Sequence, residues 1–246
     1  MLDKQIIKRD SIKKVISFGC SASDYMFGTN KVYGEVLANE LGVHYYHHGV
    51  GCGSNHRMWR RFFKYAVNGK LNENTLITIQ WTELTREEVF TRISSYIKYF
   101  QPVENEDYYE KDKNGNPDTC HHLDGLLFKY KWDMWDDKPY PINEYMKIKT
   151  DNMLSDKWSF ELWKNWEFSI FDYCKNNNIP LVMMNSKNYN NYNIYKQEEC
   201  YFNVVNYQDI FNSHPRIMEN GEKDYAHMST EGHEVLGNRI LNKLEL

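Results

Sequence analysis

Short strand-like segments alternate along this chain with longer segments whose apolar residues recur at helical spacing. We predict strands at residues 14–19, 44–48, 76–81, 181–184 and 201–205. The helical segments are 30–42, 54–69, 85–100, 155–176 and one that begins after Ser229. Such alternation is typical of a parallel sheet with helices on both faces. We therefore expect an α/β fold, a three-layer α/β/α, flavodoxin-like arrangement around a five-stranded parallel sheet with right-handed crossovers.

Residues at the predicted helix boundaries have the chemistry of caps. Ser54 and Ser229 are good N-caps, and Gly42 is suited to end the first helix. Residues 85–88, Thr-Arg-Glu-Glu, match a capping box, so we expect an amphipathic helix to follow them through residue 100.

Residues 101–150 interrupt the alternation. They are rich in Asp, Asn, Lys, Tyr and Trp, and they hold four of the six prolines. We expect an irregular, aromatic-rich insertion or lid within a single domain spanning residues 1–246, because long loops in compact domains are often functional. The aromatic residues argue against complete disorder of this segment.

Composition excludes several classes of protein. The net charge of −4 and the absence of any Lys/Arg block argue against a nucleic-acid partner. No apolar run approaches the roughly 20 residues of a membrane span, and residues 1–14 do not have the pattern of a signal peptide. The five scattered cysteines indicate reduced thiols. We expect a cytoplasmic protein, and the sequence does not indicate its oligomeric state.

Two separated segments carry residues suited to nucleophilic catalysis. Residues 15–18 lead into Gly19-Cys20-Ser21, which would deliver a serine to the carboxyl edge of the sheet, where ligands bind in open α/β folds. Near the other end of the chain, Asp224 lies three residues before His227. A carboxylate at that spacing can accept a bond from Nδ1–H and leave Nε2 to take a serine proton. Taken alone, the first segment is better explained as a strand-to-loop turn, and the second is a weak signal that a solvated Asp and a surface His also explain.

Together with two further segments, these residues resemble the SGNH/GDSL hydrolase superfamily. Residues 49–55, Gly-Val-Gly-Cys-Gly-Ser-Asn, are similar to its second block, residues 77–83 occupy the third, and residues 224–232 are similar to the last. The resemblance implies that Ser21 is the nucleophile, His227 the base and Asp224 its partner. It also implies ester hydrolysis through an acyl-enzyme, with an ester as the binding partner and no metal or organic cofactor.

The oxyanion hole is where the sequence departs from the family pattern in a way that matters. The resemblance places Gly53 in the hole, but Thr82 stands where the third block usually supplies an Asn. A threonine hydroxyl can donate one hydrogen bond. Asn55 is the alternative side-chain donor. The other departure, Cys20 in place of the family's Asp, concerns no triad residue.

Substrate and rival functions remain open at this point. Aromatic residues beside carboxylates and amides suit sugar rings, so we expect an acylated carbohydrate as substrate, with Trp81, Trp132 and Trp135 in the binding site. The main alternative is a non-catalytic binding or structural protein on the same fold. A metal site built on His44 and His48, which would share a strand face, is a weaker alternative because their spacing matches no familiar zinc pattern.

Overall fold

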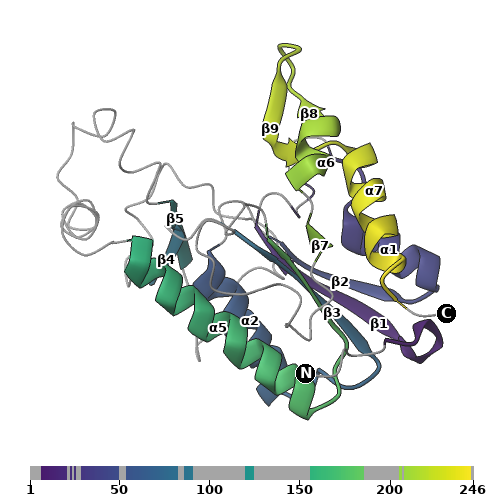
Figure 1. The fold of residues 1–246 in the computed structure, drawn as a ribbon, viewed down its shortest axis with the longest axis vertical. Helices are drawn as coiled ribbons and strands as arrows, with labels where there is room; N and C mark the ends of the chain where they lie inside the picture. Colours follow the sequence, from purple (N-terminus) through teal and green to yellow (C-terminus); the bar gives the residue numbers. More distant parts are fainter. Residues whose placement is uncertain are drawn as a thin grey trace, which may run out of the picture.

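A parallel sheet lies in the middle of the molecule, and helices cover both of its faces (Figure 1). The computed structural model describes residues 7–20, 23, 25, 29–49, 54–82, 86–90, 120–124, 156–185, 205–206 and 208–244. No helix in these ranges is both long and apolar enough to cross a membrane.

The main sheet has the strand order β2-β1-β3-β6-β7, and every neighbouring pair is parallel. Its strands are β1 (Lys14–Gly19), β2 (His44–Gly49), β3 (Thr75–Trp81), β6 (Leu181–Asn185) and β7 (Val205–Asn206). In chain order this is the 2-1-3-4-5 arrangement of flavodoxin-like folds. The α/β class with a parallel sheet is confirmed. Of the predicted last strand, residues 201–205, only Val205 is described, and it belongs to β7.

The central strands are buried on both faces, as parallel strands between two helical layers must be. All seven residues of β3 are buried, and so are five of the six in β1. The apolar side chains of these two strands form the middle of the core; they are Val15, Ile16, Phe18, Leu76, Ile77, Ile79 and Trp81.

Two pairs of helices cover the sheet. α1 (Tyr33–Leu41) and α7 (Thr230–Leu241) pack together on one face, and α2 (Asn55–Val67) and α5 (Asp156–Asn176) on the other (Figure 1). The N-caps predicted at Ser54 and Ser229 are confirmed, because the Ser54 hydroxyl accepts from the Arg57 N–H and the Ser229 hydroxyl from the Gly232 N–H. Gly42 ends α1 with a φ of +65°, a conformation that favours glycine.

Smaller elements lie outside the main sheet. β4 (Arg86–Phe90) pairs antiparallel with β5 (Cys120–Asp124), and β8 (Pro215–Ile217) pairs antiparallel with β9 (Lys223–Met228). The 3₁₀-helix η1 (Arg9–Ser11) precedes β1, and the short helix α6 (Gln208–Ser213) precedes β8.

One sequence prediction is wrong in this region. Residues 86–90 form a strand, although the capping box and apolar spacing predicted a helix over 85–100; residues 91–100 lie outside the described residues. The strand is stabilised by pairing with residues 120–124, a partner that a local pattern cannot reveal. That partner also shows that the predicted irregular insertion, residues 101–150, contains a regular strand. The rest of the insertion lies outside the described residues.

A glycine brings α7 against α1. A Cβ added to Gly237 would lie 2.7 Å from Val36 Cγ1 and 3.2 Å from the Tyr33 carbonyl oxygen. Both neighbours belong to α1 and are buried, so they have little room to move. The absence of a side chain at residue 237 is therefore what allows the two helices to approach this closely.

We predict that Gly237→Ala destabilises the protein by about 1–3 kcal/mol, because the added methyl overpacks the contact between the helices. Urea-induced unfolding measures the change. Asn238→Ala is the matched control, since residue 238 is exposed on the same helix and should tolerate alanine. Equal stability of the two variants would contradict this account of the contact.

Candidate active site

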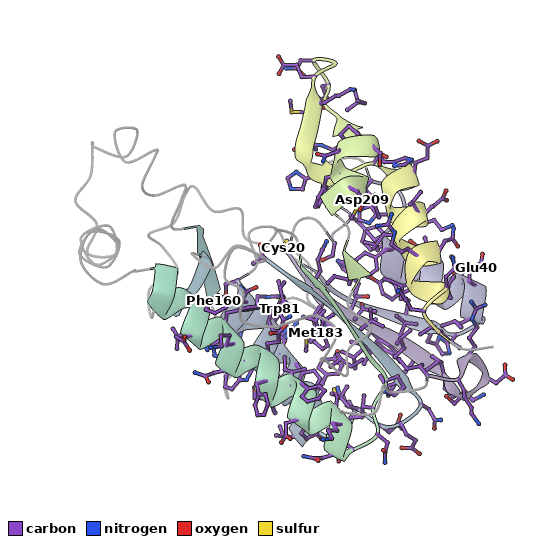
Figure 2. All side chains as sticks on the ribbon, in the orientation of Figure 1. Cys20, Glu40, Trp81, Phe160, Met183 and Asp209 are labelled. Atoms are coloured by element: carbon purple, nitrogen blue, oxygen red, sulfur yellow. The ribbon has the colours of Figure 1, made fainter. Side chains whose placement is uncertain are left out.

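The strands that carry the predicted site end side by side at one edge of the sheet. β1 is flanked by β2 and β3, and Gly19 at the end of β1 is in register with Gly49 at the end of β2. Figure 2 shows Cys20 at this edge. Ser21 and Gly53, which follow β1 and β2, lie outside the described residues. The described residues around them nevertheless define how this edge is built.

The turn after β1 is packed tightly against the strand ends. The backbone N–H and the hydroxyl of Ser23 both donate to the Cys20 carbonyl, at 3.0 and 2.9 Å. A Cβ on Gly19 would collide with Ser23 Oγ, and a Cβ on Gly49 would lie 2.8 Å from the same atom. Both glycines therefore make room for the turn. Ser23 is buried and already bonded, which makes it a structural serine and a poor alternative to Ser21 as nucleophile.

The segments after β2 and β3 are joined by the side chain of Asn55. Its Oδ1 accepts from the Thr82 N–H at 2.8 Å, and its Nδ2 donates to the Thr82 carbonyl at 3.0 Å. Both residues are buried. The Asn55 side chain is thus held against the backbone of Thr82. The Asn55 amide uses one of its N–H groups in this contact. A primary amide has two N–H donors, so its second N–H is not used in this contact.

The predicted contact between Asp224 and His227 is present. His227 Nδ1 lies 2.7 Å from Asp224 Oδ2, and Arg216 Nη2 lies 2.9 Å from the same oxygen. With Nδ1–H donating to the carboxylate, Nε2 is the basic nitrogen of the neutral ring. Arg216 was not among the predicted site residues, and only its position on the neighbouring strand reveals it.

These residues lie on a hairpin, whereas the sequence predicted a loop. Across the hairpin Arg216 pairs with Asp224, but the preceding residue, Pro215, pairs with Met228. In a regular strand, residues three apart point to opposite faces. Three extra residues on β9 form a bulge, which bends the strand and brings His227 back to the Asp224 carboxylate.

A buried histidine connects this region to α1. His233 Nδ1 accepts from the Tyr33 N–H at 3.3 Å, at the first turn of α1. Burial lowers the pKa of His233 to about 3, and nearby His47 and His227 act in the same direction. His47 stands on β2 next to Gly49.

The structure does not support a substrate-binding role for Trp81. Its side chain is fully buried, its Nε1 lies 3.4 Å from Met183 Sδ, and its ring packs edge-to-face against Trp163 (Figure 2). The aromatic pattern alone could not distinguish a cleft from the core. Trp132 and Trp135 lie outside the described residues.

The histidines of β2 do not converge on a metal site. His44 is exposed, whereas His48 is buried, with its Nε2 bonded to the Tyr65 hydroxyl at 2.6 Å. Burial, reinforced by Arg61 and Arg57, lowers the pKa of His48 to about 2. Across the residues that the structure describes, no group of three or more His, Cys, Asp or Glu side chains could hold a metal ion.

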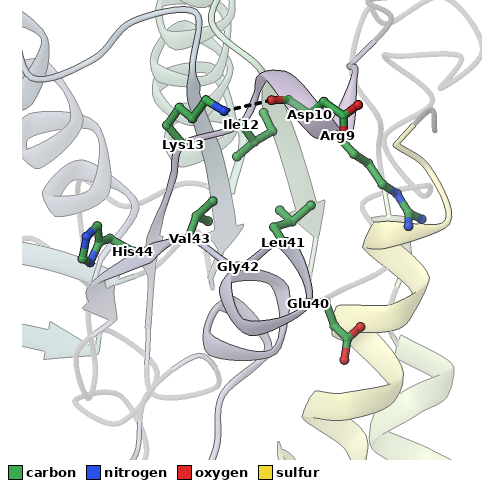
Figure 3. A pocket seen from close by; sticks show the side chains of 9 residues that line it. All are labelled: Arg9, Asp10, Ile12, Lys13, Glu40, Leu41, Gly42, Val43 and His44. Carbon is green, nitrogen blue, oxygen red and sulfur yellow. Dashed lines mark hydrogen bonds between the residues drawn. The ribbon is translucent and has the colours of Figure 1, made fainter.

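A hollow of about 720 Å³ lies at the other edge of the sheet, where β1 and β2 begin (Figure 3). It is lined by Arg9, Asp10, Ile12, Lys13, Glu40, Leu41, Gly42, Val43 and His44. None of these residues belongs to the predicted esterase site, and the Lys13 ammonium donates to the Asp10 carbonyl. The hollow is therefore separate from the candidate active site.

Comparison with known proteins gives only distant similarity. No family model and no curated protein matches the chain. A solved structure of a candidate lipolytic protein of the G-D-S-L family from Desulfitobacterium hafniense is 11% identical, with a TM-score of 0.49, covering 94% of this chain and 99% of its own. A catalytic mutant of an acetylxylan esterase from Geobacillus stearothermophilus is 12% identical, with a TM-score of 0.49 and coverages of 95% and 94%.

A member of the lipolytic protein G-D-S-L family from Veillonella parvula is 9% identical, with a TM-score of 0.46 and coverages of 94% and 97%. Two of these three structures are described as members of the G-D-S-L family. At these identities and TM-scores the matches carry no part of the proposal below, which rests on the residues of this chain.

We predict that Asn55→Ala destabilises the fold by about 2 kcal/mol or more, because each buried N–H or C=O that loses its partner costs about 1–3 kcal/mol. Thr82→Val is the matched control, since it keeps both backbone groups bonded to Asn55. Urea unfolding measures the stability, and hydrogen exchange of the Thr82 amide reports the local bond. An unchanged exchange rate in Asn55→Ala would show that the Asn55 bond does not protect this amide.

Proposed function

We propose that this protein is a serine esterase of the SGNH/GDSL type, with Ser21 as nucleophile, His227 as general base and Asp224 as the partner of the imidazole. The observation that carries the proposal is the 2.7 Å contact between His227 Nδ1 and Asp224 Oδ2. In a Ser-His-Asp triad a carboxylate orients the histidine in this way, and a turn or a surface pair does not require that orientation.

In the proposed reaction the Ser21 oxygen attacks the ester carbonyl while His227 Nε2 takes the serine proton. The tetrahedral intermediate then collapses, and the imidazolium gives that proton to the leaving alcohol. Water attacks the resulting acyl-enzyme with His227 again as base, which releases the acid and restores Ser21. Asp224 stabilises the imidazolium that forms in each half-reaction.

The proposed oxyanion hole consists of the backbone N–H groups of Ser21 and Gly53 and one side-chain donor. Thr82 holds the family position, and Asn55 is bonded to the Thr82 backbone at that same edge. One oxyanion donor is typically worth about 10²–10³ in kcat. A hole with a weaker donor therefore slows the reaction without abolishing it.

The alternative function is a binding or structural protein that has lost catalysis. The absence of the usual Asn at residue 82 favours this alternative. The His227 imidazole, oriented through Nδ1, favours a catalytic function, because ligand binding alone does not require a histidine held in this way. Labelling by a mechanism-based reagent separates the two functions directly.

We expect a fluorophosphonate probe to label the protein at Ser21, identified by mass spectrometry of the labelled peptide. Ser21→Ala should abolish both labelling and hydrolysis of a small aryl acetate while leaving the unfolding transition unchanged. Ser23→Ala is the control for labelling at this turn, since Ser23 is buried and bonded to Cys20. Hydrolysis at the wild-type rate by Ser21→Ala would exclude the proposed nucleophile.

We further propose that the ester is carried by a carbohydrate and that residues 101–150 form part of the binding site. This rests on the sequence of the insertion, which places aromatic rings among carboxylates and amides. Its aromatic residues include Tyr108, Tyr109, Tyr130, Trp132, Trp135 and Tyr140. Flat aromatic faces suit the C–H faces of sugar rings, and the amides and carboxylates suit their hydroxyls.

Replacing residues 104–138 with a short Gly/Ser linker tests the role of the insertion. The shortened protein should still hydrolyse a small aryl acetate but lose its preference for acetylated sugars over simple acetates. The measurement is the ratio of kcat/KM for the two substrates. If that ratio is unchanged and only stability or oligomerisation suffers, the insertion is structural and the carbohydrate proposal fails.

A further inference from the structure

A third side chain binds the carboxylate that holds His227. Arg216 Nη2 and His227 Nδ1 both approach Asp224 Oδ2, at 2.9 and 2.7 Å. We propose that Arg216 is a positioning residue, which fixes the Asp224 carboxylate and opposes protonation of the His227 imidazole. The kinetic consequence rests on the proposed esterase function, whereas the three-residue geometry does not depend on it.

The backbone of the hairpin places Arg216 where this role requires it. Arg216 and Asp224 are directly opposite each other in the antiparallel pair of β8 and β9. Side chains at such positions are close neighbours on one face of the pair. The bulge that follows Asp224 then returns His227 to the same carboxylate. Arg216 therefore holds the carboxylate from one strand, and His227 contacts it from the other.

The side chains of this cluster are buried enough for the charge of Arg216 to affect the protonation of His227. The Arg216, Asp224 and His227 side chains are only 16%, 14% and 20% exposed. Exposed ion pairs are largely screened by solvent, whereas partly buried ones are screened less. A carboxylate alone favours the charged imidazolium, and a neighbouring guanidinium disfavours it. Arg216 thus keeps the proposed base neutral at a lower pH than Asp224 alone would allow.

Other titratable and charged groups belong to the helices and strand around this cluster. His233 on α7 interacts electrostatically with His47 on β2 and with His227. His233 stays neutral because burial lowers its pKa to about 3. Asp209 on α6 is bound to Arg239 on α7 at 2.8 Å, in an exposed ion pair. Arg216 is a permanent cation that is bonded to the Asp224 carboxylate.

The test follows the titration of His227 by NMR in protein labelled at histidine, together with the pH dependence of kcat/KM for an aryl acetate. In Arg216→Gln we expect the His227 titration midpoint to rise by about one pH unit, the scale of a single nearby charge. The pH at which kcat/KM falls on the acid side of its profile should rise by the same amount. Arg216→Lys retains a cation, so its midpoint should stay near the wild-type value.

Arg239→Gln is the matched control, because it removes another Arg–Asp ion pair of the same region without touching Asp224. Its midpoint should equal that of the wild type. An unchanged midpoint in a folded Arg216→Gln variant would overturn the proposal and leave Arg216 with a purely structural role. If Arg216→Gln does not fold, a His227 titration midpoint that rises by a full pH unit in Arg216→Lys would overturn the proposal instead.

The two proposals fail separately. If the wild type neither hydrolyses esters nor reacts with the fluorophosphonate, but Arg216→Gln still moves the His227 midpoint, the positioning role stands and the esterase proposal falls. If hydrolysis and labelling occur but the midpoint does not move, the esterase proposal stands and the role of Arg216 falls.

Discussion

The close contact between α1 and α7 is the constraint on which the candidate site depends. α1 follows the turn that carries Ser21, and α7 follows the strand that carries Asp224 and His227. Gly237 lets the helices approach, and the His233 imidazole accepts a bond from the first turn of α1. Because both contacts are buried, they fix the relative position of two segments about 200 residues apart. This helix pair therefore fixes how the segment that carries the proposed base is joined to the rest of the fold.

Much of the fold could be predicted because it depends on local physics. Strands β1, β2, β3 and β6 and the helices that cover them have periodic or continuous apolar patterns, and their ends carry residues with capping chemistry, such as Ser54, Ser229 and Gly42. The contact between Asp224 and His227 was also predicted from their spacing, and it is present, although the structure forms it through the bulge of β9. The α/β class could be inferred because strand–helix alternation leaves few other ways to bury so many apolar faces.

What could not be predicted depends on partners distant in sequence. Residues 86–90 match a helix start, yet they form a strand because residues 120–124 pair with them. The bulge of β9 and the position of Arg216 opposite Asp224 both follow from the register of a hairpin, and a one-residue change of register would separate them. Trp81 is a core residue because β3 is buried on both faces, and an aromatic residue in a sequence does not reveal how many neighbours cover it.

The order of the elements along the chain has a consequence for synthesis. β9 and α7 follow every strand of the main sheet, so a growing polypeptide emerges from the ribosome with its sheet-forming segments first. Until α7 docks on α1, the proposed nucleophile has no base beside it. In the proposed enzyme, competence for the reaction therefore arises in one late step of folding, when a contact between distant segments closes.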